Sequence, residues 1–261
     1  MWNPFRRPQR DLEQLQSPLI ARLPPEIRYL IWNEAIGSRV LHIVRKRRRL
    51  LAMECVESFS PDLETTVHTC WGLSTTMGRR DGFYLGSRSR YPTRPANLLP
   101  LLQTCRRIYR EAVTVLYENN VFDINHVDTL AYLGRTVLPQ RLNRIRVLKF
   151  SFRFEHWDAA PYDLATWSET CDSLTRLAGL EELTIHLTGY DGRPVAGNRN
   201  KWHPILELLK QVKALKSFKV FLPLEEDLCL QMAREEEYSF NLLPRRQLPP
   251  AKWANDSCIS V

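Results

Sequence analysis

Apolar residues in the first half of the chain follow the spacings of amphipathic helices and short strands. Leu23-Pro24-Pro25-Glu26 is a helix-entry signal, because proline suits the first helical position and an acid favours the first turn. A helix from here to Gly37 would carry four apolar residues on one face: Ile27, Leu30, Ile31 and Ala35. The pattern then predicts a buried strand over 40–44 and a return strand over 50–56.

A second helix is predicted over 101–116, since an apolar stripe runs along it: Leu101, Cys105, Ile108, Ala112, Val115 and Leu116. A short strand over 121–124 follows, and Asn125 would cap one more helix. Between 57 and 97 the pattern dissolves into Gly, Pro, Ser, Thr and Arg, and we expect a largely disordered insertion. Residues 1–17 and 244–261 are expected to be tails.

The most informative pattern is a 35-residue repeat in the second half of the chain. Each unit has the spacing L-x-x-L-x-x-L-x-L-x-L, whose alternating end is typical of a strand with one buried face. All fifteen positions are apolar: Leu142, Ile145, Leu148, Phe150, Phe152; Leu177, Leu180, Leu183, Ile185, Leu187; Val212, Leu215, Phe218, Val220, Leu222. Strand–helix units stacked at a fixed period form a sheet of parallel strands, as in leucine-rich repeats.

The expected fold class is therefore α/β (α+β), with helices first and a short, irregular leucine-rich-repeat-like array of strand–helix units after them. We place the helical start and its insertion at 18–125 and the repeat units at 126–243. A helix over 224–238 would cover the open end of the array.

Strand parity also identifies residues on the sheet face opposite the core. These are Lys149, Ser151, Arg153, Thr184, His186, Lys219 and Phe221. They would make a mixed polar, mildly basic surface that faces a partner protein. The alternative is an ordinary solvated sheet face.

Composition indicates a soluble intracellular protein. The 261 residues are 44% hydrophobic, and no apolar run approaches the roughly 20 residues of a membrane helix. Six cysteines are scattered without paired spacing, which favours reduced thiols over a disulfide framework. We expect no membrane association, and a location in the cytoplasm or nucleus.

Positive charge is concentrated near the N-terminus. Residues 1–110 carry 19 Lys and Arg against 9 Asp and Glu, whereas the remainder carries 18 against 20. The densest run is Arg45, Lys46, Arg47, Arg48 and Arg49. Such a run can be a nuclear-import or nucleic-acid patch, or a solvated edge that resists aggregation. No aromatic residues are interleaved with it, as a single-strand binding platform would require.

Motifs of known chemistry are missing from the sequence. There is no G-x-x-x-x-G-K-[ST], G-x-G-x-x-G, G-x-S-x-G or H-E-x-x-H. His42, Cys55, His68 and Cys70 could gather around zinc, but no C-x-x-C is present, and we expect core thiols instead. We therefore expect neither a catalytic site nor a cofactor or metal.

Three segments resemble a known family. The segments are 23–32 (LPPEIRYLIW), 37–43 (GSRVLHI) and 101–122, which contains TCRRIYREA and LYENNVF. Over roughly residues 18–155 they resemble a large group of filamentous-fungal proteins, often called F-box-like, that carry a domain of unknown function.

The resemblance implies an F-box-like helix cluster that docks on the adaptor of a cullin ubiquitin ligase, while the repeats hold a substrate protein. The docking surface would consist of Leu23, Pro24, Ile27 and Ile31. About sixty residues separate the two helical motifs, unlike an ordinary F-box, so the same face could instead pack in the protein's own core. We expect a non-catalytic protein-interaction module, with a nucleic-acid-associated protein and an unrecognised enzyme as alternatives.

Overall fold

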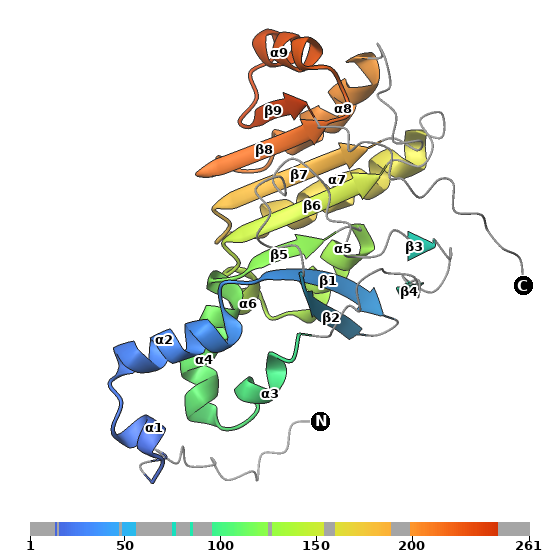
Figure 1. The fold of residues 1–261 in the computed structure, drawn as a ribbon. Helices are drawn as coiled ribbons and strands as arrows, with labels where there is room; N and C mark the ends of the chain where they lie inside the picture. The colour runs from blue at the N-terminus through green and yellow to red at the C-terminus, as the bar shows by residue number, and fades with distance from the viewer. Residues whose placement is uncertain are drawn as a thin grey trace, which may run out of the picture.

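A seven-stranded sheet forms the body of the protein, and helices cover one of its faces (Figure 1). The computed structural model describes residues 14, 16–46, 49–55, 75–76, 84–85, 96–124, 127–153, 160–188 and 199–244. Helices α1 to α4 lie together at one end of the sheet, and α9 lies at the other. None of the helices in these ranges has the length and apolar character needed to cross a bilayer.

The elements follow one another along the chain in an order that alternates strand and helix after residue 120. Their bounds are α1 (Pro18–Ala21), α2 (Pro25–Ile36), β1 (Val40–Lys46), β2 (Arg49–Glu54), β3 (Thr75–Thr76), β4 (Tyr84–Leu85), α3 (Leu99–Leu102), α4 (Arg106–Glu118), β5 (Val121–Ile124), α5 (Val127–Thr136), α6 (Pro139–Leu142), β6 (Val147–Arg153), α7 (Ala160–Thr175), β7 (Glu182–Thr188), α8 (Arg199–Leu209), β8 (Ser217–Leu222), α9 (Glu226–Glu235) and β9 (Asn241–Pro244).

The sheet order is β2-β1-β5-β6-β7-β8-β9. All neighbours in it are parallel except β1 and β2, which form the predicted antiparallel hairpin. Strands β3 and β4 form a separate two-stranded pair inside the predicted insertion. The rest of that insertion up to residue 95, residues 1–13 and residues 245–261 lie outside the described residues.

Residues that lie 35 positions apart in the sequence pair with each other on neighbouring strands of the sheet. The expected α/β class is confirmed. Leu148 on β6 pairs with Leu183 on β7, which pairs with Phe218 on β8. Of the fifteen repeat positions, all but the half-buried Leu215 are buried. The aromatic rings of Phe150 and Trp167 lie 6.2 Å apart, so α7 packs directly on the core face of β6.

Charged residues at the same repeat position form a row at the N-terminal ends of neighbouring strands. We call this row the ladder. Arg146 and Glu181 immediately precede β6 and β7, and Lys216 immediately precedes β8. Glu181 lies 3.7 Å from Arg146 and 2.6 Å from Lys216, and Arg146 also reaches Glu118 of α4 at 3.4 Å. The sign of the charge therefore alternates from unit to unit.

Two expectations about elements need correction. The helix predicted over 101–116 is divided into α3 and α4, because Cys105 adopts extended backbone angles and its sulfur caps α4 by accepting from the Ile108 amide. The chain also returns to the sheet after α9: β9 pairs with β8 as a seventh strand that the sequence pattern did not predict. α9 therefore crosses over between the last two strands.

Candidate functional site

Helices α2 and α4, which contain the two helical motifs of the sequence, contact each other through the carboxylate of Glu111. The Arg28 guanidinium of α2 donates to both oxygens of Glu111 on α4, each at 2.8 Å. Arg107 and the Trp32 indole donate to the same carboxylate at 2.9 and 3.2 Å. These donors hold the pKa of Glu111 at about 2, with the Arg28 hydrogen bond as the largest cause. α2 is thus fixed on α4 although 83 residues separate Arg28 from Glu111.

A buried asparagine connects helices α2 and α4, which together we call the helical unit, to the sheet. The Asn120 amide donates to the carbonyls of Ile36 and Leu116 at 2.8 and 2.9 Å, and its oxygen accepts from the Arg39 amide. One side chain thereby joins the ends of α2 and α4 to the start of β1. The helices and the sheet are consequently joined by buried hydrogen bonds.

The packing of α2 contradicts the alternative prediction that its apolar face packs in the protein's own core. The helix buries Arg28, Trp32 and Ile36. Ile27, Leu30 and Ile31 are 43, 60 and 37% exposed. The side of α2 that contains the Arg28 ion pair therefore faces the core. The apolar row of Ile27, Leu30 and Ile31 lies on the surface.

We define the α2 surface as the exposed side chains Pro24, Ile27, Tyr29, Leu30 and Ile31. It contains three of the four predicted adaptor-docking residues, and the fourth, Leu23, is half-buried beside it. The Tyr29 hydroxyl accepts from the Asn119 amide at 2.6 Å, which fixes that ring against the end of α4. Sequence reasoning did not include Tyr29 and Leu30 in the docking set, although both lie in the same apolar run.

The predicted sheet-face residues do share one face. Met53, His42, Asp123, Lys149, Thr184, Lys219 and Asn241 pair in turn across all seven strands. Lys149, Ser151, Thr184 and Lys219 are half-buried. His186 and Phe221 are buried and stacked, with ring centroids 4.7 Å apart, and the side chain of Arg153 lies outside the described residues.

One end of this face holds a buried polar group. His42 Nδ1 lies 3.0 Å from Asp123 Oδ2, and both side chains are buried. Burial by itself would lower the pKa of His42, but hydrogen bonds to Asp123 and Cys55 outweigh it, and the pKa is raised. Of the four residues considered for zinc, His42 and Cys55 meet here, whereas His68 and Cys70 lie outside the described residues.

The basic run covers the end of β1 and the start of β2. Lys46 pairs with Arg49, and Arg47 and Arg48 lie outside the described residues. The Arg45 guanidinium lies 4.7 Å from the centre of the Tyr132 ring on α5. Nucleic-acid binding by this run stays a prediction.

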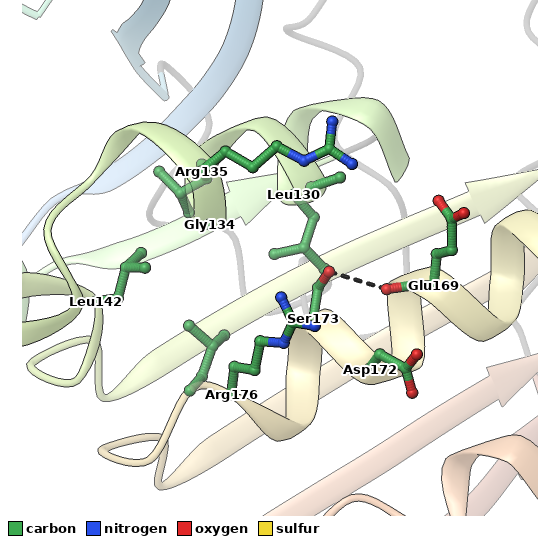
Figure 2. A pocket seen from close by; sticks show the side chains of 11 residues that line it. Leu130, Gly134, Arg135, Leu142, Glu169, Asp172, Ser173 and Arg176 are labelled. Carbon is green, nitrogen blue, oxygen red and sulfur yellow. Dashed lines mark hydrogen bonds between the residues drawn. The ribbon is translucent and has the colours of Figure 1, made fainter.

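The helical layer contains a cavity of about 250 Å³ between α5 and α7 (Figure 2). Leucines line its floor, and Arg135, Glu169, Asp172, Ser173 and Arg176 lie around its mouth. Sequence reasoning did not find this cavity, because its residues come from three helices, α5, α6 and α7, and from the segment after α7.

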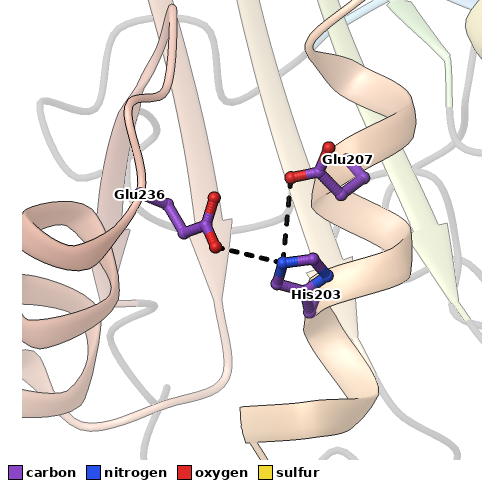
Figure 3. A group of neighbouring side chains, drawn as sticks. All are labelled: His203, Glu207 and Glu236. Carbon is purple, nitrogen blue, oxygen red and sulfur yellow. Dashed lines mark hydrogen bonds and ion pairs between the residues drawn. The ribbon is translucent and has the colours of Figure 1, made fainter.

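A second polar cluster joins α8 to the segment after α9 (Figure 3). His203 Nε2 lies 3.1 Å from Glu236 and 3.8 Å from Glu207. Lys210 forms ion pairs with both carboxylates and its pKa is raised by them. Because the Lys210 ammonium and His203 already contact both carboxylates, we interpret the cluster as an ion-pair network between elements.

The chain matches the family model of a domain of unknown function, DUF7730, over residues 12–238. No curated protein and no solved structure matches the chain. The matched residues include α2 with its surface, α4, the strands β1 to β8 and α9. The chain therefore belongs to the DUF7730 family.

Proposed function

We propose that this chain is a non-catalytic protein-interaction module. In its sharpest form it is an F-box-like substrate receptor that docks the adaptor of a cullin ubiquitin ligase through the α2 surface. The sheet face around Lys149, Thr184 and Lys219 would then contact the substrate protein.

The exposed apolar row of α2 is the observation that carries this proposal. Ile27, Leu30 and Ile31 stand at i, i+3 and i+4 on one side of α2, and Tyr29, on another side of the helix, is 46% exposed. Contiguous exposed apolar side chains on a soluble domain typically mark a binding site for another protein. A helix that presents its apolar face suits a partner with an apolar groove.

The fixed position of α2 further supports docking. The contacts of Arg28 and Trp32 with Glu111 hold the helix on α4 from its buried side. A preformed surface loses little conformational entropy on binding, which favours affinity. The apolar row is thus presented in one orientation relative to the sheet.

The sheet face supports a second contact site on the same molecule. Lys149, Thr184 and Lys219 occupy one register row on β6, β7 and β8. Neighbouring strands lie about 4.8 Å apart, so the two lysines project about 10 Å from each other with the threonine between them. This row is separated along the sheet from α2 (Figure 1), which would let the chain hold two proteins at once.

Direct binding to a purified fungal cullin-ligase adaptor tests the proposal. The double variant Ile27→Asp/Leu30→Asp places charges on the α2 surface without touching the core, so we expect at least about tenfold weaker binding at an unchanged Tm. The matched control is Leu230→Asp, on the exposed side of α9, where the leucine is 46% exposed. This control should bind as the unmodified chain does.

The ligase version fails if the unmodified chain does not bind the adaptor. It also fails if both variants bind equally well, because the α2 surface would then not be the contact. Loss of adaptor binding on neutralising Arg45, Lys46 and Arg49, with the α2 variant unaffected, would transfer the contact to the basic hairpin and contradict the proposal.

A further inference from the structure

The cavity between α5 and α7 has an apolar floor. Leu130 and Leu133 of α5, Leu142 of α6 and Leu177 line it, and all four belong to the buried core. Its volume of about 250 Å³ is below the roughly 300–1,000 Å³ of pockets for drug-sized ligands. The floor can therefore take one large apolar side chain.

The mouth of the cavity carries charges of both signs. Glu169, Asp172 and Ser173 stand at i, i+3 and i+4 on one side of α7, Arg176 directly follows this helix, and Arg135 of α5 also lines the cavity. In Figure 2 the Arg176 side chain extends into the space between the two helices.

These charges are not used within the protein. Within the described residues neither Arg135 nor Arg176 forms an ion pair, and the carboxylates of Glu169 and Asp172 have none either. Elsewhere in the helical layer some charges are paired, as Lys210 is with Glu207 and Glu236. The cavity thus combines an apolar floor with available cations and anions at its mouth.

Gly134 lines the cavity, and its lack of a side chain leaves space there. A Cβ added at this position of α5 would meet no atom within 4 Å, so no close contact requires glycine there. Glycine weakens a helix relative to alanine. The space left by the missing side chain opens onto the cavity that Gly134 lines.

We propose that this cavity binds a free α-amino acid with a large apolar side chain. Its side chain would lie on the leucine floor, its carboxylate would accept hydrogen bonds from Arg176 and Arg135, and its ammonium would donate to Glu169 or Asp172. Arginine–carboxylate pairs are strong, directional contacts. A phosphate ligand is disfavoured by the two acids, and a sugar by the apolar floor.

Titration of the full chain with L-phenylalanine, followed by NMR of the leucine methyl groups, tests this site. The titration extends to about 20 mM, since one buried side chain supports a dissociation constant on the order of 1 mM. Phenylalaninamide and N-acetylphenylalanine each lack one charge and imitate the two ends of a polypeptide. We expect each to bind about tenfold more weakly, and glycine not to bind, because they lose a charged contact or the side chain.

Variants separate the contacts. Arg176→Gln should weaken L-phenylalanine about tenfold and leave phenylalaninamide unchanged, because only the former has a carboxylate to lose. Gly134→Leu should fill the cavity and abolish binding, whereas Arg22→Gln, at an exposed arginine directly after α1, should have no effect. The Tm of each variant verifies that it folds.

Three results would overturn the proposal. One is no methyl shift at the cavity up to the highest concentration. Another is binding of phenylalaninamide or N-acetylphenylalanine at least as tight as that of L-phenylalanine, which would identify a polypeptide terminus as the ligand. The third is unchanged binding by a folded Gly134→Leu variant.

Discussion

The contact between Arg28 and Glu111 predicts a large single-residue effect on stability. Glu111→Ala leaves the Arg28 guanidinium, whose side chain is 4% exposed, buried without its counter-charge. We expect the free energy of unfolding to fall by about 3–5 kcal/mol, measured by urea denaturation. The control Glu54→Ala removes an exposed pair with Arg39 and should cost under about 1 kcal/mol. Equal losses in the two variants would contradict this account.

The same carboxylate predicts an acid limb in the stability profile. The pKa of Glu111 is lowered from 4.5 to about 2 in the folded protein, chiefly by its hydrogen bond from Arg28. Ionised Glu111 therefore stabilises the fold fully above pH 4.5, and this contribution is lost as the pH falls toward 2. Unfolding measured against pH should show a shallower acid loss in Glu111→Gln than in the unmodified chain.

His42 predicts the opposite dependence. Burial disfavours its charged form, but the hydrogen bonds to Asp123 and Cys55 prevail and raise its pKa above the ordinary 6.5. The stabilising contribution of protonated His42 is complete below pH 6.5 and is lost as the pH rises through the folded-state pKa. Asp123→Asn should flatten this alkaline loss, seen as a smaller fall in Tm between neutral and alkaline buffer. A slope unchanged by the substitution would show that another group titrates.

At the scale of elements, two glycines on either side of α7 predict opposite outcomes. A Cβ on Gly179, between α7 and β7, would overlap the Asn143 carbonyl of the preceding unit, whereas a Cβ on Gly134 meets nothing. We expect Gly179→Ala to cost about 1–3 kcal/mol through overpacking and Gly134→Ala to stabilise by up to about 1 kcal/mol through helix propensity. Thermal unfolding of the pair decides this, and a stabilising Gly179→Ala would show that the turn relaxes.

Elements with a strict local period could be predicted from the sequence, and elements defined by distant partners could not. The strands β6, β7 and β8 follow from alternation that repeats every 35 residues, because packing on one face imposes it. The buried side of α2 depends on Glu111, 83 residues from Arg28, and no local pattern encodes that contact. The β9 sequence, NLLP, shows no alternation and ends in proline, so only its pairing with β8 defines that strand.

The same distinction holds for the candidate sites. The face shared by Lys149, Thr184 and Lys219 follows from strand parity, but the burial of His186 and Phe221 on it does not. The cavity between α5 and α7 requires the packing of two helices, and its residues have no motif spacing in common.

For the whole molecule, the order of the sheet predicts graded unfolding. Each strand pairs only with its neighbours, as in repeat proteins, where stability is the sum of units and interfaces. Ile185→Ala in the interior strand β7 should cost about 2–5 kcal/mol and raise hydrogen exchange throughout β5 to β9. Leu242→Ala at the edge should raise exchange only in β8, α9 and β9. Exchange that rises equally everywhere in both variants would indicate a single cooperative unit.

The alternating ladder of Glu118, Arg146, Glu181 and Lys216 restricts how such a chain could grow. Duplicating one 35-residue segment ending at Lys216 would set two lysines beside each other on adjacent strands, where like charges repel. Duplicating two consecutive segments would preserve the succession of acid and base. Longer versions of this architecture should consequently gain strands in twos, or replace a charge wherever an odd one was inserted.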